Sequence, residues 1–97
     1  MNKKRDRLQI IHDILKAIAS RNGRIKPTHI LYKSNISHQM LEDYLKEMIV
    51  KGFIEEHDLG PSKTYSVMPK GFEYLNKYKL IIEFTESFGL NEDEGFG

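Results

Sequence analysis

The chain has 97 residues and carries 15 Lys and Arg against 14 Asp and Glu, which suits a single domain of nearly balanced charge. Hydrophobic residues form 39% of it and charged residues 30%, as in ordinary globular proteins, and no apolar run approaches the roughly 18 residues that a membrane span needs. The absence of cysteine excludes disulfides and thiolate metal sites and makes the cytoplasm the expected compartment.

The two parts of the chain differ in charge. Residues 1–40 carry nine Lys and Arg against Asp6 and Asp13, whereas residues 41–97 carry six Lys and Arg against twelve Asp and Glu. A basic segment suits contacts with phosphate groups, and an acidic segment suits repulsion from nucleic acid or a protein partner. Both segments are also compatible with ordinary solvated surfaces.

The first predicted helix covers residues 5–21. Its apolar residues recur at helical spacing and form a wide stripe: Leu8, Ile10, Ile11, Ile14, Leu15, Ala17 and Ile18. Asn22-Gly23 ends this helix, and residues 24–26 are short and extended. Pro27-Thr28 then opens a short second helix that ends near Lys33, because proline is tolerated in a first helical turn.

Residues 37–51 carry the clearest helix signals in the chain. Ser37 suits the N-cap, because its hydroxyl can accept a hydrogen bond from an unpaired backbone N–H of the first turn. One apolar stripe follows at positions i, i+3, i+4 and i+7: Leu41, Tyr44, Leu45 and Met48. Lys51-Gly52 supplies a cation and a glycine at the end. With the tight turn at 33–35, this pattern predicts a helix-turn-helix.

A hairpin pattern comes next, with strands at 53–58 and 63–68 and turn residues at 59–62. In the second strand the alternation places Thr64, Ser66 and Met68 on one face and Tyr65 and Val67 on the other. The fold class that we predict is therefore α+β, mainly α: a winged helix-turn-helix over residues 1–68, with a three-helix core and a β-hairpin wing.

A last helix is predicted from Phe72 to about Phe88, within a segment 69–88. Five of its residues step by 4, 3, 4 and 3, the spacing of a helix–helix seam: Tyr74, Tyr78, Ile81, Thr85 and Phe88. Ile82 lies beside this seam, which we expect to form a homodimer. The expected interface consists of Tyr74, Tyr78, Ile81, Ile82, Thr85 and Phe88. The alternative is that this helix packs on helix 5–21 of its own chain. Residues 89–97, acidic and rich in glycine, are predicted to be a disordered tail.

Several runs in the chain carry a resemblance to a known family. They are Thr28 to Ser37 (THILYKSNIS), Arg5 to Ile11, Lys51 to Ile54, and Lys70 to Leu75. With them, the chain resembles the small archaeal winged-helix DNA-binding proteins of about ten kilodaltons, which dimerise through a long C-terminal antiparallel coiled coil. The resemblance implies binding of double-stranded DNA, as a transcription regulator or a chromatin-like protein associated with the nucleoid. It implies no enzyme activity, cofactor or metal.

The predicted DNA contacts follow from the way a helix-turn-helix docks, with its second helix in the major groove and that helix's N-terminus toward the bases. Helix 37–51 would read bases, with Gln39 suited to adenine, Glu42 or Asp43 to cytosine and Lys46 to guanine or phosphate. The wing, residues 59–63, would lie on the backbone or in the minor groove. The full candidate set is Lys3, Lys4, Arg5, Lys26, His29, Lys33, Ser34, Asn35, Ser37, His38, Gln39, Glu42, Asp43, Lys46, Ser62 and Lys63.

Other interpretations stay open at this point. Because helix 37–51 is acidic, the domain could instead be a protein-interaction module that recruits a basic partner. A ligand- or metal-responsive switch between helices 5–21 and 72–88 is a third hypothesis. The chain has no HExxH motif, Gly-rich phosphate loop or nucleophile elbow, so we expect no enzyme. Tyr32, Tyr44 and Tyr65 are expected in the core rather than as platforms for base stacking.

Overall fold

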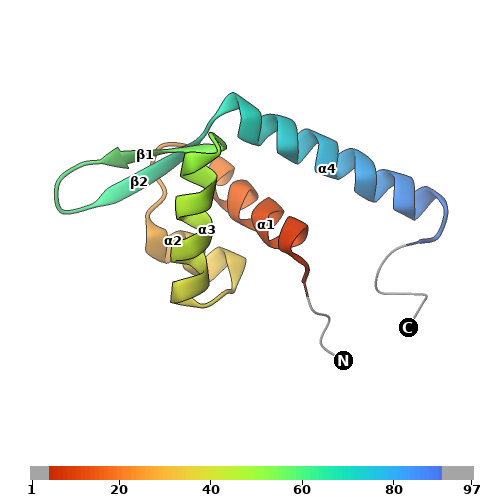
Figure 1. The fold of residues 1–97 in the computed structure, drawn as a ribbon, viewed down its shortest axis with the longest axis horizontal. Coiled ribbons are helices and arrows are strands. Elements are labelled where there is room, and N and C mark those ends of the chain that lie inside the picture. Colours follow the sequence, from red (N-terminus) through yellow and green to blue (C-terminus); the bar gives the residue numbers. More distant parts are fainter. Residues whose placement is uncertain (1–4, 91–97) are drawn as a thin grey trace.

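The computed structural model describes residues 5–90, which form four helices and one antiparallel hairpin (Figure 1). The elements are α1 (Arg7–Ser20), α2 (Pro27–Ser34), α3 (His38–Val50), β1 (Ile54–Asp58), β2 (Lys63–Val67) and α4 (Pro69–Ser87). This is the predicted architecture: a three-helix core followed by a hairpin wing and a long C-terminal helix. The predicted acidic tail, apart from Gly89 and Leu90, lies outside the described residues.

The core forms around α1, which packs against α2, β2 and α4. Ile14, Leu15 and Ile18 are completely buried, and each such side chain contributes roughly 1.5–3 kcal/mol through removal from water. Ile25 and Ile30 close the core from the α2 side. The stripe predicted for this helix is therefore confirmed, except at its first member, since Leu8 is 52% exposed.

The turn between α2 and α3 is fixed by two local devices. Asn35 adopts a left-handed conformation (φ 54°) and its N–H donates to the carbonyl oxygen of Leu31 at 2.9 Å, which ends α2. Ser37 then caps α3, as predicted, because its Oγ accepts from the N–H of Met40 at 3.1 Å. The turn sets the direction in which α3 leaves α2.

The hairpin pairs Ile54 with Val67 at its base and Asp58 with Lys63 near its tip. The extended segment before α2 joins it through a single bridge, Ile25 to Tyr65. The predicted alternation of β2 is only partly right, because Thr64 is buried together with Tyr65 and Val67. The start of β2 is therefore covered on both faces.

The last helix begins earlier than predicted. Pro69 occupies its first turn, so Pro69, Lys70 and Gly71 lie inside α4 rather than before it. Gly71 makes this possible: a Cβ built at this position would lie 2.4 Å from the carbonyl oxygen of Phe53. Only glycine lets the first turn of α4 lie so close to the backbone of Phe53.

The first half of α4 packs on α1 of its own chain. The hydroxyl of Tyr74 donates to the carbonyl oxygen of Leu8 at 2.6 Å, and the ring of Tyr78 stacks on His12 with centroids 4.5 Å apart. The second half of α4 extends past α1 and away from the body of the domain (Figure 1). The intramolecular alternative thus holds for the first half of the predicted seam.

Candidate nucleic-acid interface

The outer face of α3 carries the polar groups that the sequence assigned to base recognition. His38, Gln39, Glu42, Asp43 and Lys46 are all exposed, whereas the opposite face of the helix is in the core. The amide nitrogen of Gln39 donates to Oδ1 of Asp43 at 3.1 Å, so one amide hydrogen is used within the helix and the second stays available. We call these five residues the recognition face.

One acidic side chain of α3 is neutralised by its neighbours. Glu47 forms an ion pair with Arg7 of α1, and Lys51 donates to the same carboxylate at 2.9 Å. The hydrogen bonds from Arg7 and then Lys51 lower the pKa of Glu47 to about 2. Within residues 5–90, Glu42 and Asp43 make no such ion pair. The recognition face therefore keeps two carboxylates against one lysine.

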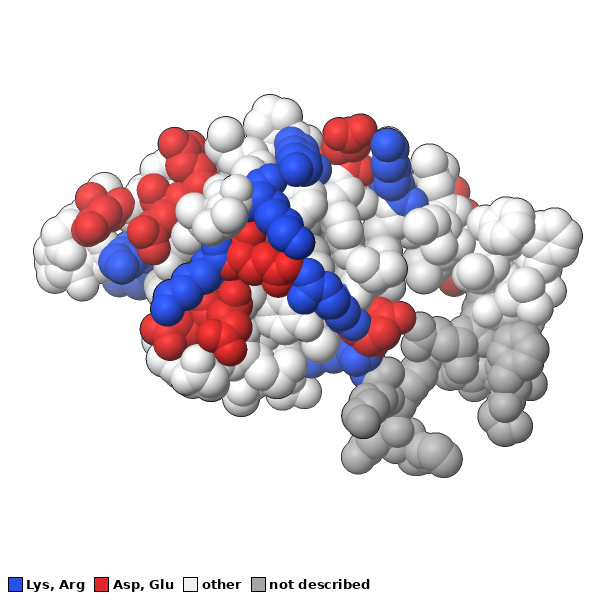
Figure 2. All heavy atoms as spheres, in the orientation of Figure 1, with Lys and Arg blue, Asp and Glu red and all other residues white. Residues whose placement is uncertain are grey.

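The wing is also acidic. Glu55, Glu56 and Asp58 are exposed on β1, and acidic groups cover this part of the hairpin in Figure 2. Lys63 is the wing cation that the sequence indicated, and its Nζ lies 3.7 Å from Oε2 of Glu56. Ser62 precedes it, partly exposed. The wing thus offers one partly compensated cation for a phosphate contact.

Two predicted contact residues make contacts within the chain. Ser34 is fully buried and its hydroxyl donates to the carbonyl oxygen of Ile30, so its side chain cannot reach a ligand. Arg5 donates to Asp13 at 2.6 Å and to the carbonyl oxygen of Asn35 at 2.9 Å, which ties the N-terminal segment to the turn before α3. Lys3 and Lys4, the rest of the predicted arm, lie outside the described residues.

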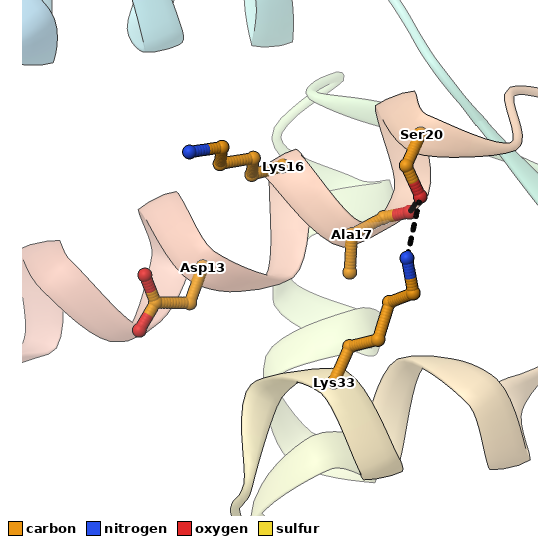
Figure 3. Close-up of a pocket in the computed structure, with 5 residues that line it drawn as sticks. All are labelled: Asp13, Lys16, Ala17, Ser20 and Lys33. Atoms are coloured by element: carbon orange, nitrogen blue, oxygen red, sulfur yellow. Dashed lines mark hydrogen bonds between the residues drawn. The ribbon is translucent and has the colours of Figure 1, made fainter.

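The basic residues of α2 point toward α1 rather than joining the recognition face. Nζ of Lys33 donates to Oγ of Ser20 at 3.2 Å (Figure 3), and Nη1 of Arg21 donates to Nδ1 of His29 at 3.4 Å. Lys26 is exposed just before α2. The predicted phosphate-binding residues are therefore divided between two surfaces.

Three exposed cations beside them were not among the predicted contacts: Lys16, Arg21 and Arg24. A signal was present, because residues 14–40 contain no Asp or Glu at all. Tyr32 was also misjudged. It is 87% exposed on the outer side of α2, while Tyr65 is buried as expected and Tyr44 is partly buried. The helix is too short for periodicity to define its apolar side securely.

Candidate metal sites and membrane-spanning helices are both absent from residues 5–90. No group of three or more His, Asp or Glu is arranged there to hold a metal ion. In the same residues, no helix combines the length and apolar character that crossing a bilayer requires.

Comparisons with known proteins add to this geometry. A family model described as winged helix-turn-helix matches residues 4–86. An uncharacterized protein of Methanocaldococcus jannaschii is 34% identical over 78 residues, which are 80% of this chain and 34% of that protein. The chain thus spans about a third of the length of this curated relative.

Two solved structures share the fold. Sso10a-2, a DNA-binding protein from Sulfolobus solfataricus, superposes with a TM-score of 0.75 at 20% identity, over 87% of this chain and 85% of that one. F-93 of SSV1 superposes with a TM-score of 0.66 at 20% identity, over 96% of this chain and all of the other (100%). At such identities the likeness concerns the fold alone.

Proposed function

The chain belongs to the winged helix-turn-helix family, and from this premise we propose that it binds double-stranded DNA as a transcription regulator or a chromatin-like protein. In the proposed complex α3 lies in the major groove and residues 59–63 of the wing lie on the backbone or in the minor groove. The observation that carries the proposal is the recognition face, a run of exposed polar side chains at the capped N-terminal part of α3. The description of Sso10a-2 as a DNA-binding protein supports it.

The proposed roles follow from the chemistry of each side chain. Gln39 pairs with adenine, and Lys46 reaches guanine or a phosphate. Glu42 and Asp43 accept from the amino group of cytosine, and a good bidentate pair contributes ~1–3 kcal/mol of discrimination. Near Ser37, the free N–H groups at the start of α3 favour a phosphate oxygen. Two carboxylates on this face weaken non-specific attraction, so the proposal is of a protein that reads sequence.

We also propose a homodimer formed through the second half of α4. Four large apolar side chains are exposed there and at the C-cap: Leu80 at 57%, Ile81 at 55%, Phe84 at 61% and Phe88 at 65%. Small proteins seldom leave so many apolar groups together in water without a partner. Ile81 and Phe88 belong to the seam that the sequence predicted, whereas Leu80 and Phe84 shift the proposed interface around the helix, away from the face that packs on α1.

A second candidate function rests on the acidic groups. Glu42 and Asp43 on α3 and Glu55 and Asp58 on β1 are exposed, and within residues 5–90 none of these four carboxylates forms an ion pair. Such a surface suits a basic protein segment. In that case the domain is an interaction module, and it binds no duplex at moderate salt.

Fluorescence anisotropy of a labelled mixed-sequence duplex, titrated across a salt series, tests the proposal. We expect the logarithm of the affinity to fall linearly with the logarithm of the salt concentration, by roughly 0.9 for each phosphate neutralised. The variant Q39A/K46A should bind more weakly, while K79A, which removes an exposed lysine of α4, should bind like the native protein. Equal binding by Q39A/K46A and the native protein would refute the proposed recognition face. Absence of duplex binding at low salt would favour the interaction module.

A further inference from the structure

A uniformly positive stretch of the described chain lies on α1, α2 and the segment that joins them, not on α3. Every Lys and Arg within residues 14–40 is exposed: Lys16, Arg21, Arg24, Lys26 and Lys33. No carboxylate lies in this stretch of sequence to compensate them. By contrast, α3 and the wing mix both signs of charge, with carboxylates in excess. An electrostatic footprint of nucleic acid should fall where cations are uncompensated.

Contacts across the two helices hold part of this charge together. Lys33 of α2 reaches Ser20 of α1, and Arg21, just past the end of α1, reaches His29 of α2. We call the surface formed by Lys16, Ser20, Arg21, His29 and Lys33 the α1–α2 face. Because these contacts tether Lys33 and Arg21, less side-chain entropy remains to be lost when they bind an anion.

A hollow of about 370 Å³ opens on this face, lined by Asp13, Lys16, Ala17, Ser20 and Lys33 (Figure 3). In this view α1 and α2 frame the hollow and α3 lies behind them. The carboxylate at its edge, Asp13, is already engaged, with Arg5 at 2.6 Å and Nδ1 of His12 at 3.1 Å. Lys16 and Lys33 therefore line the hollow with little opposing charge beside them.

We propose that the α1–α2 face binds the phosphate backbone of a second DNA duplex, so that one protomer contacts two separate segments of DNA. Its cations are spread over two helices instead of converging on one point, which suits a row of phosphates better than a single small anion. No aromatic ring lines the hollow, so stacking of unpaired bases has no platform there. Contacts of this kind carry no sequence information, unlike those proposed for α3.

The proposal extends DNA binding to a surface that uses no residue of α3 or of the wing. It therefore makes a prediction that separates the two sites. With a short duplex in excess, the backbone amide resonances of Ala17, Ser20 and Lys33 should move in an NMR titration. Those of Gln39 and Lys46 should move as well, with a different midpoint.

Two double variants, one on each face, show which surface produces each midpoint. They are matched because each removes two positive charges. K16Q/R21Q should weaken the binding reported by Ala17 and Ser20 about tenfold at low salt, and reduce its salt slope by about 1.8, as expected for two lost phosphate contacts. At about 0.15 M salt, where the Debye length is about 8 Å, it should leave the binding reported by Gln39 within about twofold of the native value, because charges on the other face are largely screened there. K46Q/K63Q should do the reverse, and K77Q/K79Q on α4 should change neither.

Three results would overturn the second site. They are α1–α2 amides that stay in place at excess duplex, amides on both faces that share one midpoint, and equal weakening of both midpoints by K16Q/R21Q. If only the α1–α2 amides move, the second site stands and the proposed role of α3 fails. If only the α3 amides move, the proposed role of α3 stands and the second site fails.

Discussion

Replacing Gly71 by alanine tests the closest backbone approach in the fold. The added Cβ would lie 2.4 Å from the carbonyl oxygen of Phe53, 2.7 Å from Cγ1 of Val67 and 3.3 Å from Cδ2 of Leu15. The valine methyl can move, but the carbonyl cannot easily do so, because it also accepts from the N–H of Met68 at 2.9 Å. Helix α4 must therefore shift away from the core.

The magnitude follows from two opposing terms. Alanine in place of glycine within a helix normally stabilises by about 1 kcal/mol, whereas overpacking costs about 1–3 kcal/mol. Because the clash involves backbone, we take the upper part of that range and expect G71A to lower the free energy of unfolding by ~1–2 kcal/mol, or the Tm by roughly 5–15 °C.

Urea denaturation followed by far-ultraviolet circular dichroism measures this, at one fixed protein concentration because self-association would alter the apparent stability. The matched control is Asn76→Ala on the exposed side of α4, which should be neutral or slightly stabilising. A G71A protein as stable as the native one would refute the reasoning, since it would show that α4 can retreat from Phe53 at no cost.

Three further outcomes are expected. The pKa of Glu47 is lowered from 4.5 to about 2, so its contribution to stability is complete above pH 4.5 and is lost as the pH falls toward 2; the Tm of E47Q should depend less on pH across that window, and an identical profile would contradict this. Asn35 is left-handed, so N35A should unfold about 1 kcal/mol more easily than N35G, and equal urea midpoints would argue against strain there. Burial, the first cause in both cases, raises the pKa values of Tyr65 and Tyr74 from 10 to about 12, so their stabilising effect is complete below pH 10 and lost between pH 10 and 12; in an ultraviolet absorbance titration Y65F and Y74F should each lack one late phase.

The sequence was informative wherever a structural feature depends on neighbours within a few positions. The N-cap at Ser37 and the stripe buried by α3 were both predicted, because capping and periodicity are local. The contacts of Lys33 and Arg5 were not predicted. Each depends on a partner from another element, Ser20 in one case and Asp13 in the other, and sequence spacing gives no information on which cations a fold will bring beside which partners.

The seam of α4 shows a different limit. Periodicity defines an apolar face but does not say what covers it. Tyr74 and Tyr78 share the spacing of Ile81 and Phe88, yet the two tyrosines pack on α1 of the same chain while the other two side chains remain exposed. Beyond the end of α1, the apolar spacing along α4 continues, but no element within residues 5–90 covers it.

A series of contacts links the turn before α3 to α4. Arg5 holds both the carbonyl of Asn35 and the carboxylate of Asp13, and the neighbouring His12 supports the ring of Tyr78. Since these contacts pass through α1, they help to fix the angle between α3 and α4 within the chain. In the proposed dimer, joined through α4, two such angles would set the distance between the two α3 helices. A dimer of this type reads DNA half-sites that lie one helical turn apart, about 34–36 Å, or a multiple of it. Weakening the contacts of Arg5 and His12 would therefore reduce the preference for one half-site spacing, without altering any group proposed to touch a base.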